Sequence, residues 1–539
     1  METEVLIVGA GPTGLMLANQ LARRGVRPLL VDRHPGPSLQ TRALGVQART
    51  LEIYAKLGLA ERAIELGKRG NGAHLWSQGR QIGAVSFGDA GDASTPYPYI
   101  LVLGQDDNER IMGEKLREQG VSVQWNTELL ALEQDATHAV ATLKQPDGAM
   151  RKITAAWVAG CDGARSAVRT LSGIDFPGAP YEHVFFVADV TATGGMVADE
   201  VNVYLWREGF HLFFPMRGTN HWRIVGIVPP QLREQEGLDF AAVVPSLRGE
   251  AGAGLSIQAC SWFSTYRIHH RAAERFRDGR CLLLGDAAHV HSPVGAQGMN
   301  TGLQDAYNLA WKLALVVQGR ADATLLDSYE AERQPVAQRL LDTTDRAFRL
   351  VVSDNPLAGL LRTQVLARIA AFGMRRRSVR RVAFRTVSQT GIHYRRSPLS
   401  VATDELPGKA PRAGDRFPWM KLQLEAGGAV QDLFQALDDT CCNLLVFGHA
   451  PPPLSEMDGL LRVHTIPVTA GNEAEQARVH VPRSAFYLLR PDGHVGLCGR
   501  AVDAAAVRRY FAAKLALRDG GATGELQPAT GQLLKSHPL

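Results

Sequence analysis

Short apolar runs separated by polar turns open the chain and predict alternating strands and helices. Glu4–Val8 and Pro28–Val31 have the length of buried strands, and between them apolar residues recur every three or four positions, as on one face of a helix. The same order returns at Cys281–Leu284, which precedes a loop rich in Gly and Pro and then a long apolar-periodic helix from about residue 298. Strands that alternate with helices predict an α/β unit with a parallel sheet.

The stretch 181–272 has a different pattern. Its apolar segments alternate or run continuously at strand length, with turn residues between them: Val184–Val190, Glu200–Trp206, His211–Pro215 and Trp222–Val228. We therefore expect an antiparallel sheet without crossover helices, inserted into the α/β unit as a lid over its site. Alternation places Phe210, Leu212 and Phe214 on one face of this sheet. His211 and Phe213 fall on the other face, and periodicity does not say which face lines the pocket.

The C-terminal part divides at residues 407–411, whose Pro and Gly content predicts a linker. Before it, residues 325–400 are predicted to be mainly helical and contain a run of arginines: Arg362, Arg368, Arg375, Arg376, Arg377, Arg380, Arg381 and Arg385. A solvated helical face explains this run most simply, and a dimer contact or a contact with an acidic surface is the alternative. After the linker we expect strands at 444–447, 463–466 and 486–490, a helix at 504–517 and a loose tail from Gly520.

The first strand runs into a turn that predicts nucleotide binding. Gly9, Gly11 and Gly14 have the spacing G-x-G-x-x-G, and the second strand ends in Asp32. In this context the glycines let the backbone approach a pyrophosphate, and the carboxylate accepts hydrogen bonds from ribose hydroxyls. The segment 160–166 also follows an apolar run but lacks the three-glycine spacing. One dinucleotide site of this class is therefore predicted, and a second dinucleotide would bind without such a domain of its own.

A second candidate element is the long helix that begins near Gly298, behind a loop with Pro293 and Gly295. A helix that starts behind glycines presents backbone N–H groups and the positive end of its dipole to an electron-rich group. Asp286, at the end of the preceding strand, is placed to hold hydroxyl groups. A plain strand–turn–helix packing unit is the alternative interpretation of this stretch alone.

Taken together, the Gly9 turn, the Asp162-Gly163 segment and the Gly285-Asp286 segment resemble the motifs of the FAD-dependent aromatic hydroxylases, the single-component flavoprotein monooxygenases typified by p-hydroxybenzoate hydroxylase. The chain is most similar to the phenol and pentachlorophenol monooxygenase branch and to the polyketide hydroxylases. The resemblance implies an α/β fold: a Rossmann-like FAD-binding domain from residues 1–180 and 273–345, an antiparallel-sheet substrate domain at 181–272, a helical segment at 346–403, a thioredoxin-like domain at 404–520 and a loose tail at 521–539.

The same resemblance assigns residues to the cofactor and the substrate. It implies that FAD is held by residues from all three motifs and from segments between them: Gly9, Gly11, Gly14, Asp32, Arg33, Arg42, Gln105, Leu129, Asp162, Gly163, Arg169, Gly285, Asp286, Pro293, Gly298, Met299 and Asn300. The Asp162-Gly163 motif, with Ser166, would also support the transient encounter with NADPH or NADH. The substrate pocket is expected to include Gln47, Phe214 and Trp206.

The implied activity is the NAD(P)H- and O2-dependent hydroxylation of a phenolic or polycyclic aromatic substrate through a flavin C4a-hydroperoxide. The helix terminus at 298–300 would stabilise negative charge on the flavin. A base near the substrate hydroxyl would help, because a phenolate is attacked faster than a phenol. Gln47 stands where some relatives carry an ionisable residue, and an amide cannot accept the proton. Tyr266, Arg267 and His211 are the candidate substitutes, and each is equally compatible with packing or surface positions.

Composition and residue spacing indicate which partners, metals and thiol chemistry to expect. The net charge of +5 on 539 residues gives no reason to expect a nucleic-acid partner, and neither a signal peptide nor a membrane span is predicted. The six cysteines are scattered, which favours free thiols in a reducing cytoplasm, and the adjacent Cys441 and Cys442 do not form the C-x-x-C of a thiol-exchange catalyst. His289 and His291 lack further metal ligands at suitable spacing, so no metal is expected. A monomer or a homodimer fits the sequence equally well.

Two alternatives to ring hydroxylation remain open. A Baeyer–Villiger or epoxidising monooxygenase would use the same flavin chemistry. A flavin-binding protein without turnover is the alternative from a different class, and it predicts a damaged flavin motif, whereas all three motifs are intact. A flavin halogenase is disfavoured because its Trp-x-Trp-x-Ile-Pro signature is absent.

Overall fold

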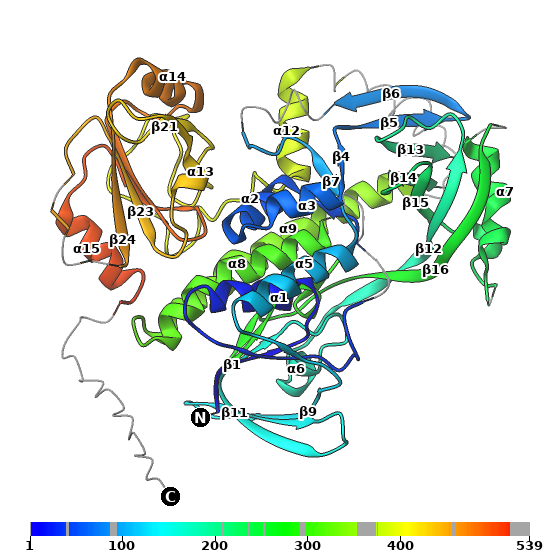
Figure 1. Ribbon diagram of the computed structural model, residues 1–539, viewed down its shortest axis with the longest axis horizontal. Helices are drawn as coiled ribbons and strands as arrows, with labels where there is room; N and C mark the ends of the chain where they lie inside the picture. Colours follow the sequence, from blue (N-terminus) through cyan, green and yellow to red (C-terminus); the bar gives the residue numbers. More distant parts are fainter. Residues whose placement is uncertain are drawn as a thin grey trace, which may run out of the picture.

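The computed structural model describes residues 2–38, 43–86, 94–206, 209–235, 237–251, 254–291, 297–352, 373, 376–451, 453–454, 457 and 459–517. Several positions singled out in the sequence lie outside these ranges: Arg42, Pro293, Gly295, Arg362, Arg368, Arg375 and the tail from residue 521. The described chain forms a mixed α/β fold in which two large sheets and a smaller C-terminal sheet surround a bundle of helices (Figure 1).

The first sheet has eight strands and a parallel centre, in the order β17-β18-β11-β1-β2-β8, with β10 and β9 attached through β11. Its strands are β1 (Thr3–Val8), β2 (Leu29–Val31), β8 (Val123–Gln124), β9 (Glu128–Gln134), β10 (Ala139–Lys144), β11 (Met150–Gly160), β17 (Arg277–Asp278) and β18 (Cys281–Leu283). Strand β1 runs parallel to β2 and β11, and β11 runs parallel to β18. Segments more than 250 residues apart in sequence therefore share one parallel sheet.

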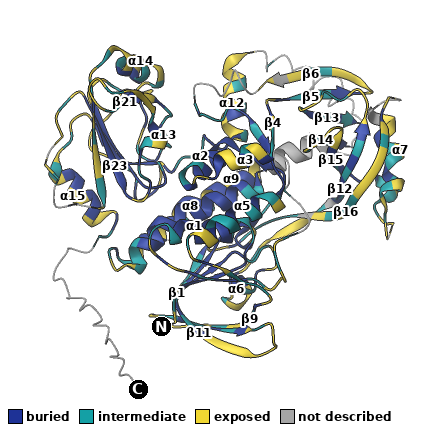
Figure 2. Ribbon diagram, in the orientation of Figure 1, coloured by how far each residue is buried: buried dark blue, intermediate teal, exposed yellow. Residues whose placement is uncertain are grey.

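Three helices lie side by side above this sheet: α1 (Pro12–Ala22), α5 (Gln105–Glu118) and α8 (Gly298–Val317), with α9 (Asp327–Val352) behind them (Figure 1). Helix α8 is buried on every side from Asn300 to Ala314, which is why it is dark along its length in Figure 2. The smaller elements here are β3 (Gly45–Val46), α2 (Ala48–Leu57), α3 (Ala60–Leu66), β4 (Lys68–Gly70), β7 (Ile100–Val102), α6 (Ala167–Leu171), the 3-10 turns η2 (Gly285–Ala287) and η3 (Ala323–Leu326), and α12 (Arg377–Val387).

The second sheet has the order β19-β16-β12-β15-β14-β13-β5-β6. Its strands are β5 (Gly72–Ser77), β6 (Arg80–Ser86), β12 (Gly178–Thr193), β13 (Val201–Trp206), β14 (Gly209–Pro215), β15 (His221–Ile227), β16 (Ser256–Ala272) and β19 (His289–Val290). Helix α7 (Phe240–Ala251), which follows the 3-10 turn η1 (Pro230–Leu232), covers one face of this sheet and buries Val243 and Leu247 against it. The four predicted strands are present, while β16 and α7 were not predicted and β5 and β6 join the sheet from outside 181–272.

A five-stranded sheet in the order β20-β26-β25-β23-β24 forms the C-terminal part. Its elements are β20 (Val401–Ala402), α13 (Leu433–Ala436), β23 (Cys442–Phe447), β24 (Leu461–Ile466), α14 (Ala470–Val479), β25 (Ala485–Leu489), β26 (Val495–Gly499) and α15 (Ala504–Ala513), with a hairpin of β21 (Lys421–Gln423) and β22 (Val430–Asp432). One apolar cluster joins Trp311 and Leu325 to Phe486 and Tyr510, so this sheet packs directly on helix α8. The strands and the helix predicted at 444–447, 463–466, 486–490 and 504–517 fall on β23, β24, β25 and α15.

Candidate functional site

The carboxyl ends of the parallel strands bring the sequence motifs to one edge of the first sheet. Strand β1 ends at Val8, before the glycine turn, and its register places Val8 opposite Val31 of β2 and Gly160 of β11. Gly160 in turn lies opposite Leu283 of β18. The loops that begin after these four strands therefore meet at one edge, where ligands bind in open α/β sheets.

The three glycines of the first turn have different neighbours. A Cβ at Gly9, whose φ is +101°, would lie 2.4 Å from the Cys161 carbonyl oxygen, and a Cβ at Gly14 would lie 1.9 Å from the Gly9 carbonyl oxygen. A Cβ at Gly11 would meet nothing within 4 Å. Gly9 and Gly14 are thus required by the packing of the protein itself. Gly11 leaves open space over the N-terminus of α1, which is the cradle that a pyrophosphate needs.

Asp32 is held against this turn. Its Oδ2 accepts a hydrogen bond from the Ala10 backbone N–H at 2.7 Å, and its Oδ1 accepts one from the His34 N–H at 2.8 Å. Arg33, next in the chain, is exposed. The Asp32 carbonyl accepts from the N–H of Thr127, which places Leu129 of β9 two residues further along, with 5% of its surface exposed. Asp32 is therefore oriented by backbone donors and keeps lone pairs for a further hydroxyl.

The Asp162-Gly163 loop is organised by two charged side chains. Asp162 accepts hydrogen bonds from Ser166 Oγ at 2.5 Å and from the Ala167 N–H at 2.6 Å, so it caps helix α6. Burial raises the pKa of Asp162, and these hydrogen bonds oppose the rise. Arg169 donates to the carbonyls of Ala164 and Ala287, both at 2.8 Å. It thereby ties the Asp162 loop to the Gly285-Asp286 loop.

A buried network of hydrogen-bonded charged side chains holds the Gly285-Asp286 loop in place. Asp305 of α8 accepts from the Gly285 N–H at 3.0 Å, faces His289 Nε2 at 2.7 Å and accepts from Arg333 Nε at 2.6 Å. Burial alone would raise the pKa of Asp305, but Arg333 and His289 hold it below its ordinary value. Asp286 is exposed although Gly285 and Ala287 are buried. The loop is therefore fixed through Asp305 while the Asp286 carboxylate faces outward.

Helix α8 begins at the same edge without a side-chain cap at Gln297. Asn300 uses its side chain differently: Oδ1 accepts from the Gln47 N–H at 2.9 Å and from Thr50 Oγ1 at 2.7 Å, and Nδ2 donates to the Gly45 carbonyl at 2.7 Å. Among the residues that the structure describes, a Cβ at Gly298 would contact the His291 ring alone, at 3.5 Å. Met299, beside it, is half-buried. The first turn of α8 is therefore locked to the 45–50 segment and leaves room above Gly298.

Gln105 starts α5 near this edge, and its backbone N–H donates to the Ala43 carbonyl at 3.1 Å. Its side chain donates to Glu109 Oε1 at 2.8 Å. Gln47, which precedes α2, is fully buried against Asn300. The loops that carry the three flavin motifs thus meet at one edge of the first sheet, where Arg169 joins two of them and the buried Leu129 follows the segment that bonds to Asp32.

The second sheet separates the predicted pocket residues onto two faces. His211, Trp206 and Phe213 lie on the face that α7 covers, and the His211 and Trp206 rings stack at 5.5 Å. Burial lowers the pKa of His211 to about 3, and neither ring nitrogen has a hydrogen-bond partner among the described residues. Phe214 and Tyr266 lie on the opposite face. Arg267 is exposed and pairs in register with Val184 on the α7 side.

The face opposite α7, which we call the open face, carries apolar residues that are only partly covered. They include Leu205, Leu212, Phe214 and Tyr266, with Phe185, Phe210 and Ile227 buried between them. The Tyr266 hydroxyl has no hydrogen bond to any residue within the described ranges, and burial raises the pKa of Tyr266 to about 12 although Arg223 opposes this. Tyr266 is therefore a protonated donor in an apolar surrounding.

One ion pair on the open face was missed by sequence reasoning. Arg223 and Asp189 are register partners on β15 and β12, and the guanidinium makes two hydrogen bonds to the carboxylate. The Arg223 side chain is 3% exposed and that of Asp189 25%. Arg223 also lies 5.1 Å from the centre of the Trp262 ring. A charged residue in the otherwise apolar alternation of Trp222–Val228 was the signal that could have found it.

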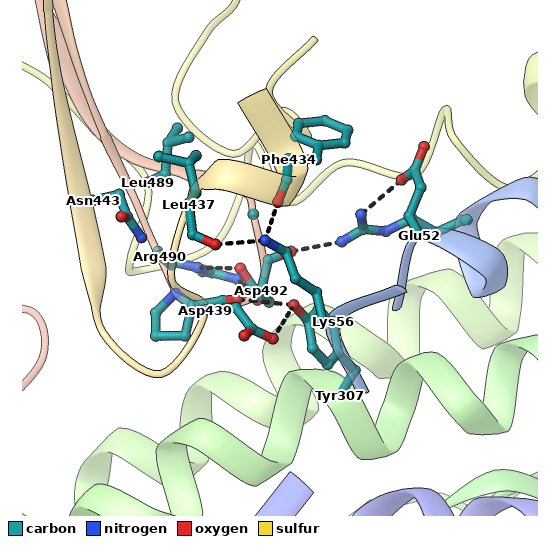
Figure 3. Close-up of a pocket in the computed structure, with 13 residues that line it drawn as sticks. Glu52, Lys56, Tyr307, Phe434, Leu437, Asp439, Asn443, Leu489, Arg490 and Asp492 are labelled. Atoms are coloured by element: carbon teal, nitrogen blue, oxygen red, sulfur yellow. Dashed lines mark hydrogen bonds and ion pairs between the residues drawn. The ribbon is translucent and has the colours of Figure 1, made fainter. Parts of the chain in front are cut away.

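A second set of missed residues joins the flavin-side elements to the C-terminal part. Glu52 of α2 accepts hydrogen bonds from Arg49, Thr95 and Arg416. Figure 3 shows Lys56 directed at the carbonyls of Phe434 and Leu437, and Tyr307 directed at Asp439. The charged groups that line this small cavity all have partners, either another charged side chain, a hydroxyl or a backbone carbonyl, so we interpret it as a packed interface rather than a ligand site.

These observations agree with an FAD site. The open space at Gly11 and Gly298, the exposed Asp286 and the oriented Asp32 are where a dinucleotide would approach, and the protein alone does not require glycine at Gly11. Within the described ranges, no group of three or more His, Cys, Asp or Glu side chains could hold a metal ion. No helix in the same ranges is long and apolar enough to cross a membrane.

Comparison with known proteins gives the class. The family model described as "FAD binding domain" matches residues 2–344, and the chain belongs to this family. The protein is an FAD-dependent aromatic monooxygenase. NAD(P)H is the typical reductant in this family.

Three relatives are informative. 6-Methylpretetramide 4-monooxygenase of Streptomyces rimosus is 34% identical over 92% of this chain and 91% of its own. Pentachlorophenol 4-monooxygenase of Sphingobium chlorophenolicum is 34% identical over 77% of this chain and 76% of its own. The crystal structure of a ternary complex of aklavinone-11 hydroxylase with FAD and aklavinone superimposes with a TM-score of 0.78 and 26% identity, covering 96% of this chain and 99% of the other.

Proposed function

We propose that the FAD-binding unit is a Rossmann-like domain built from residues 1–180 and 273–345, and that 181–272 form the substrate domain. Residues 346–403 would be a helical segment and 404–520 a thioredoxin-like domain. The parallel order β18-β11-β1-β2-β8, with the glycine turn at its carboxyl edge, supports the first assignment. The pairing of β13 with β5 extends the substrate sheet into residues 72–86.

FAD would be held by backbone at Gly9, Gly11, Gly14, Gly163, Gly285 and Gly298–Asn300, by the carboxylates of Asp32 and Asp286, and by Arg33, Gln105, Leu129 and Asp162 around them. Arg169 and Asp305 would position the loops rather than touch the cofactor. When bound, FAD supplies the redox chemistry with NAD(P)H and O2. The uncapped N-terminus of α8 would face its negative charge.

The substrate would be a phenolic or polycyclic aromatic compound lying on the open face. The observation that carries this proposal is that this face combines partly covered aromatic and aliphatic side chains with Tyr266 and the Arg223–Asp189 pair. The relatives agree with this proposal: two are named as monooxygenases of 6-methylpretetramide and of pentachlorophenol, and the third is a complex with aklavinone. Flat rings fit such a surface because aromatic faces stack on Phe and Tyr side chains.

None of the three candidate substitutes is suited to remove the phenol proton on the open face at neutral pH. His211 lies on the other face, and Tyr266, with its pKa raised to about 12, is protonated. Gln47 is an amide. Tyr266 would therefore donate a hydrogen bond to the substrate oxygen, and the proton would leave to water.

The C-terminal domain would be structural. Burial raises the pKa of both Cys441 and Cys442, which disfavours the thiolate needed for exchange. Its contacts with Glu52 and Tyr307 connect it to α2 and α8 instead.

The activity is tested by incubating the enzyme with NADPH or NADH and a panel of phenols, aromatic acids and polycyclic quinones under labelled oxygen gas. We expect one labelled oxygen atom in a ring hydroxyl of the product, and less peroxide per NAD(P)H oxidised when the substrate is present. A lactone or epoxide product would favour the oxygen-insertion alternative. No product with any compound, despite full FAD content, would contradict the proposal.

The cofactor site is tested with a matched pair of glycine variants. Gly11→Ala should fold normally, because its Cβ meets no protein atom, but should weaken FAD binding at least about tenfold, equivalent to about 1.4 kcal/mol. Gly9→Ala should instead reduce soluble folded protein, because its Cβ would overlap the Cys161 carbonyl. Unchanged FAD affinity in Gly11→Ala, measured by calorimetric titration, would remove this assignment.

A further inference from the structure

Helix α12 is attached at its C-terminal end to the first turns of α8. Gln297 Nε2 donates to the Thr386 carbonyl at 3.2 Å, and Gln389 bonds to both Thr301 and Gln304. Phe384 is buried against the start of α2. The end of α12 is thus part of the wall beside the helix terminus at Gly298, while most of its N-terminal half is exposed, as its colour in Figure 2 shows.

The exposed part of α12 carries arginines for which the described part of the chain supplies no ion-pair partner. Residues 355–403 contain ten arginines and no Asp, Glu or Lys, so the rest of the chain, whose total is +5, has a net charge of −5. Among the described residues, no ion pair involves Arg376, Arg377, Arg381 or Arg385. Four of these ten arginines lie on α12 and Arg376 directly precedes it, so positive charge is gathered on a helix whose C-terminal end contacts the start of α8.

This arrangement is unfavourable for the helix itself. Arg377 and Arg381, and likewise Arg381 and Arg385, are four residues apart, where like charges repel. Arg376 and Arg377 stand at the positive end of the helix dipole, where a cation is disfavoured. An anion seated on the helix would relieve both effects.

The reaction needs a recognition site for an anionic reductant. The sequence has one dinucleotide-binding turn, and FAD uses it, so NAD(P)H must be recognised elsewhere while its nicotinamide reaches the flavin. The phosphates of NAD(P)H are negatively charged, whereas α12 carries only positive charge. Arg is the side chain best suited to bind phosphate, because its guanidinium can donate two parallel hydrogen bonds.

We propose that the arginines of α12, centred on Arg377 and Arg381, form the phosphate-recognition surface for NAD(P)H. The proposal rests on the proposed function, in which NAD(P)H is the reductant. The extra 2′-phosphate of NADPH makes it the more strongly attracted of the two nucleotides. Arginine side chains on a helix next to the flavin site raise the local concentration of an anionic reductant and do not take part in the chemistry.

The test uses the FAD-loaded full-length enzyme and the double variant Arg377→Gln/Arg381→Gln. The control, Arg27→Gln/Lys514→Gln, removes the same charge at exposed positions: Arg27 precedes β2 at the amino edge of the first sheet, and Lys514 follows α15. Anaerobic flavin reduction is followed against NADPH and NADH concentration at low and high salt. Reduction by dithionite, which needs no nucleotide site, checks that the flavin is intact in every protein.

For the α12 variant we expect the NADPH concentration at half-maximal rate to rise about tenfold at low salt, with a smaller rise for NADH and an unchanged limiting rate. High salt should remove most of the difference. The control should behave as wild type. Equal NADPH dependence in the variant and wild type would overturn the proposal, as would an effect confined to the KM of the aromatic substrate, which would assign the arginines to substrate attraction. A wild-type enzyme that NAD(P)H never reduces would instead reject the proposed function.

Discussion

The two faces of the second sheet are made by the same strands and have opposite properties. On the α7 side, Phe186, Tyr204 and Phe213 are fully buried, and even His211 is enclosed without a polar partner among the described residues. On the open face, Leu212, Phe214 and Tyr266 are only partly covered and lie beside an ion pair. Adjacent residues of β14, Phe213 and Phe214, therefore have different surroundings. The closed face stabilises the sheet, and the open face is the surface that we propose for the substrate.

The largest expected effect is on the closed face. Phe213→Ala should lower the free energy of unfolding by about 3–5 kcal/mol, because it leaves a cavity in a fully buried cluster. Denaturant unfolding followed by circular dichroism measures the loss. Below the unfolding transition, the ratio of hydroxylated product to NAD(P)H consumed should equal that of wild type. A changed ratio in folded Phe213→Ala protein would contradict the assignment of separate roles to the two faces.

His211 gives the closed face a dependence on pH. Its pKa in the folded state, about 3, lies below the ordinary value of 6.5, so the unfolded chain binds the proton more tightly. The stability that depends on the neutral ring is present above pH 6.5 and is lost as the pH falls toward 3. His211→Leu should therefore show a shallower decline of melting temperature between these pH values than wild type. His221→Leu, the same change at an exposed site on β15, is the control, and an identical slope in His211→Leu and wild type would contradict the burial argument.

A smaller effect is expected from the Tyr266 hydroxyl. Tyr266→Phe should lower kcat/KM by a factor equivalent to the loss of about 0.5–1.5 kcal/mol of transition-state stabilisation, the contribution of one neutral hydrogen bond. The free energy of unfolding should be nearly unchanged. Tyr204→Phe makes the same change on the closed face and should leave kcat/KM unaltered. Equal kinetics for the two variants, measured at saturating NAD(P)H, would show that Tyr266 does not contact the substrate.

Local patterns predicted much of this molecule. The glycine turn with Asp32, the four strands from Val184 to Val228 and the alternation that separates Phe214 from Phe213 all depend on neighbours within a few residues, and the structure agrees with them. The cover of one face depends on α7, and the extent of the sheet depends on β16; both follow later in the chain and were not predicted.

Polar pairs between residues far apart in the chain could not be predicted from the sequence. Asp305 meets Arg333, Glu52 meets Arg416, and Arg223 meets Asp189 only because the fold brings their elements together. Arg223 stands in an apolar segment, which signals a partner without identifying it, whereas Asp305 and Glu52 stand among polar residues that give no such signal.

The most direct test of the account is the coupling of the Phe214→Ala enzyme. Phe214 lies on the open face in register with Arg223, and a dry, filled surface there should protect the oxygen chemistry from water. With a substrate that wild type hydroxylates, product and peroxide are measured against NAD(P)H consumed, together with the rate of flavin reduction. We expect less product and more peroxide per NAD(P)H, with a smaller change in the reduction rate. Unchanged coupling in a folded, FAD-loaded Phe214→Ala enzyme would contradict the assignment of the open face to the substrate.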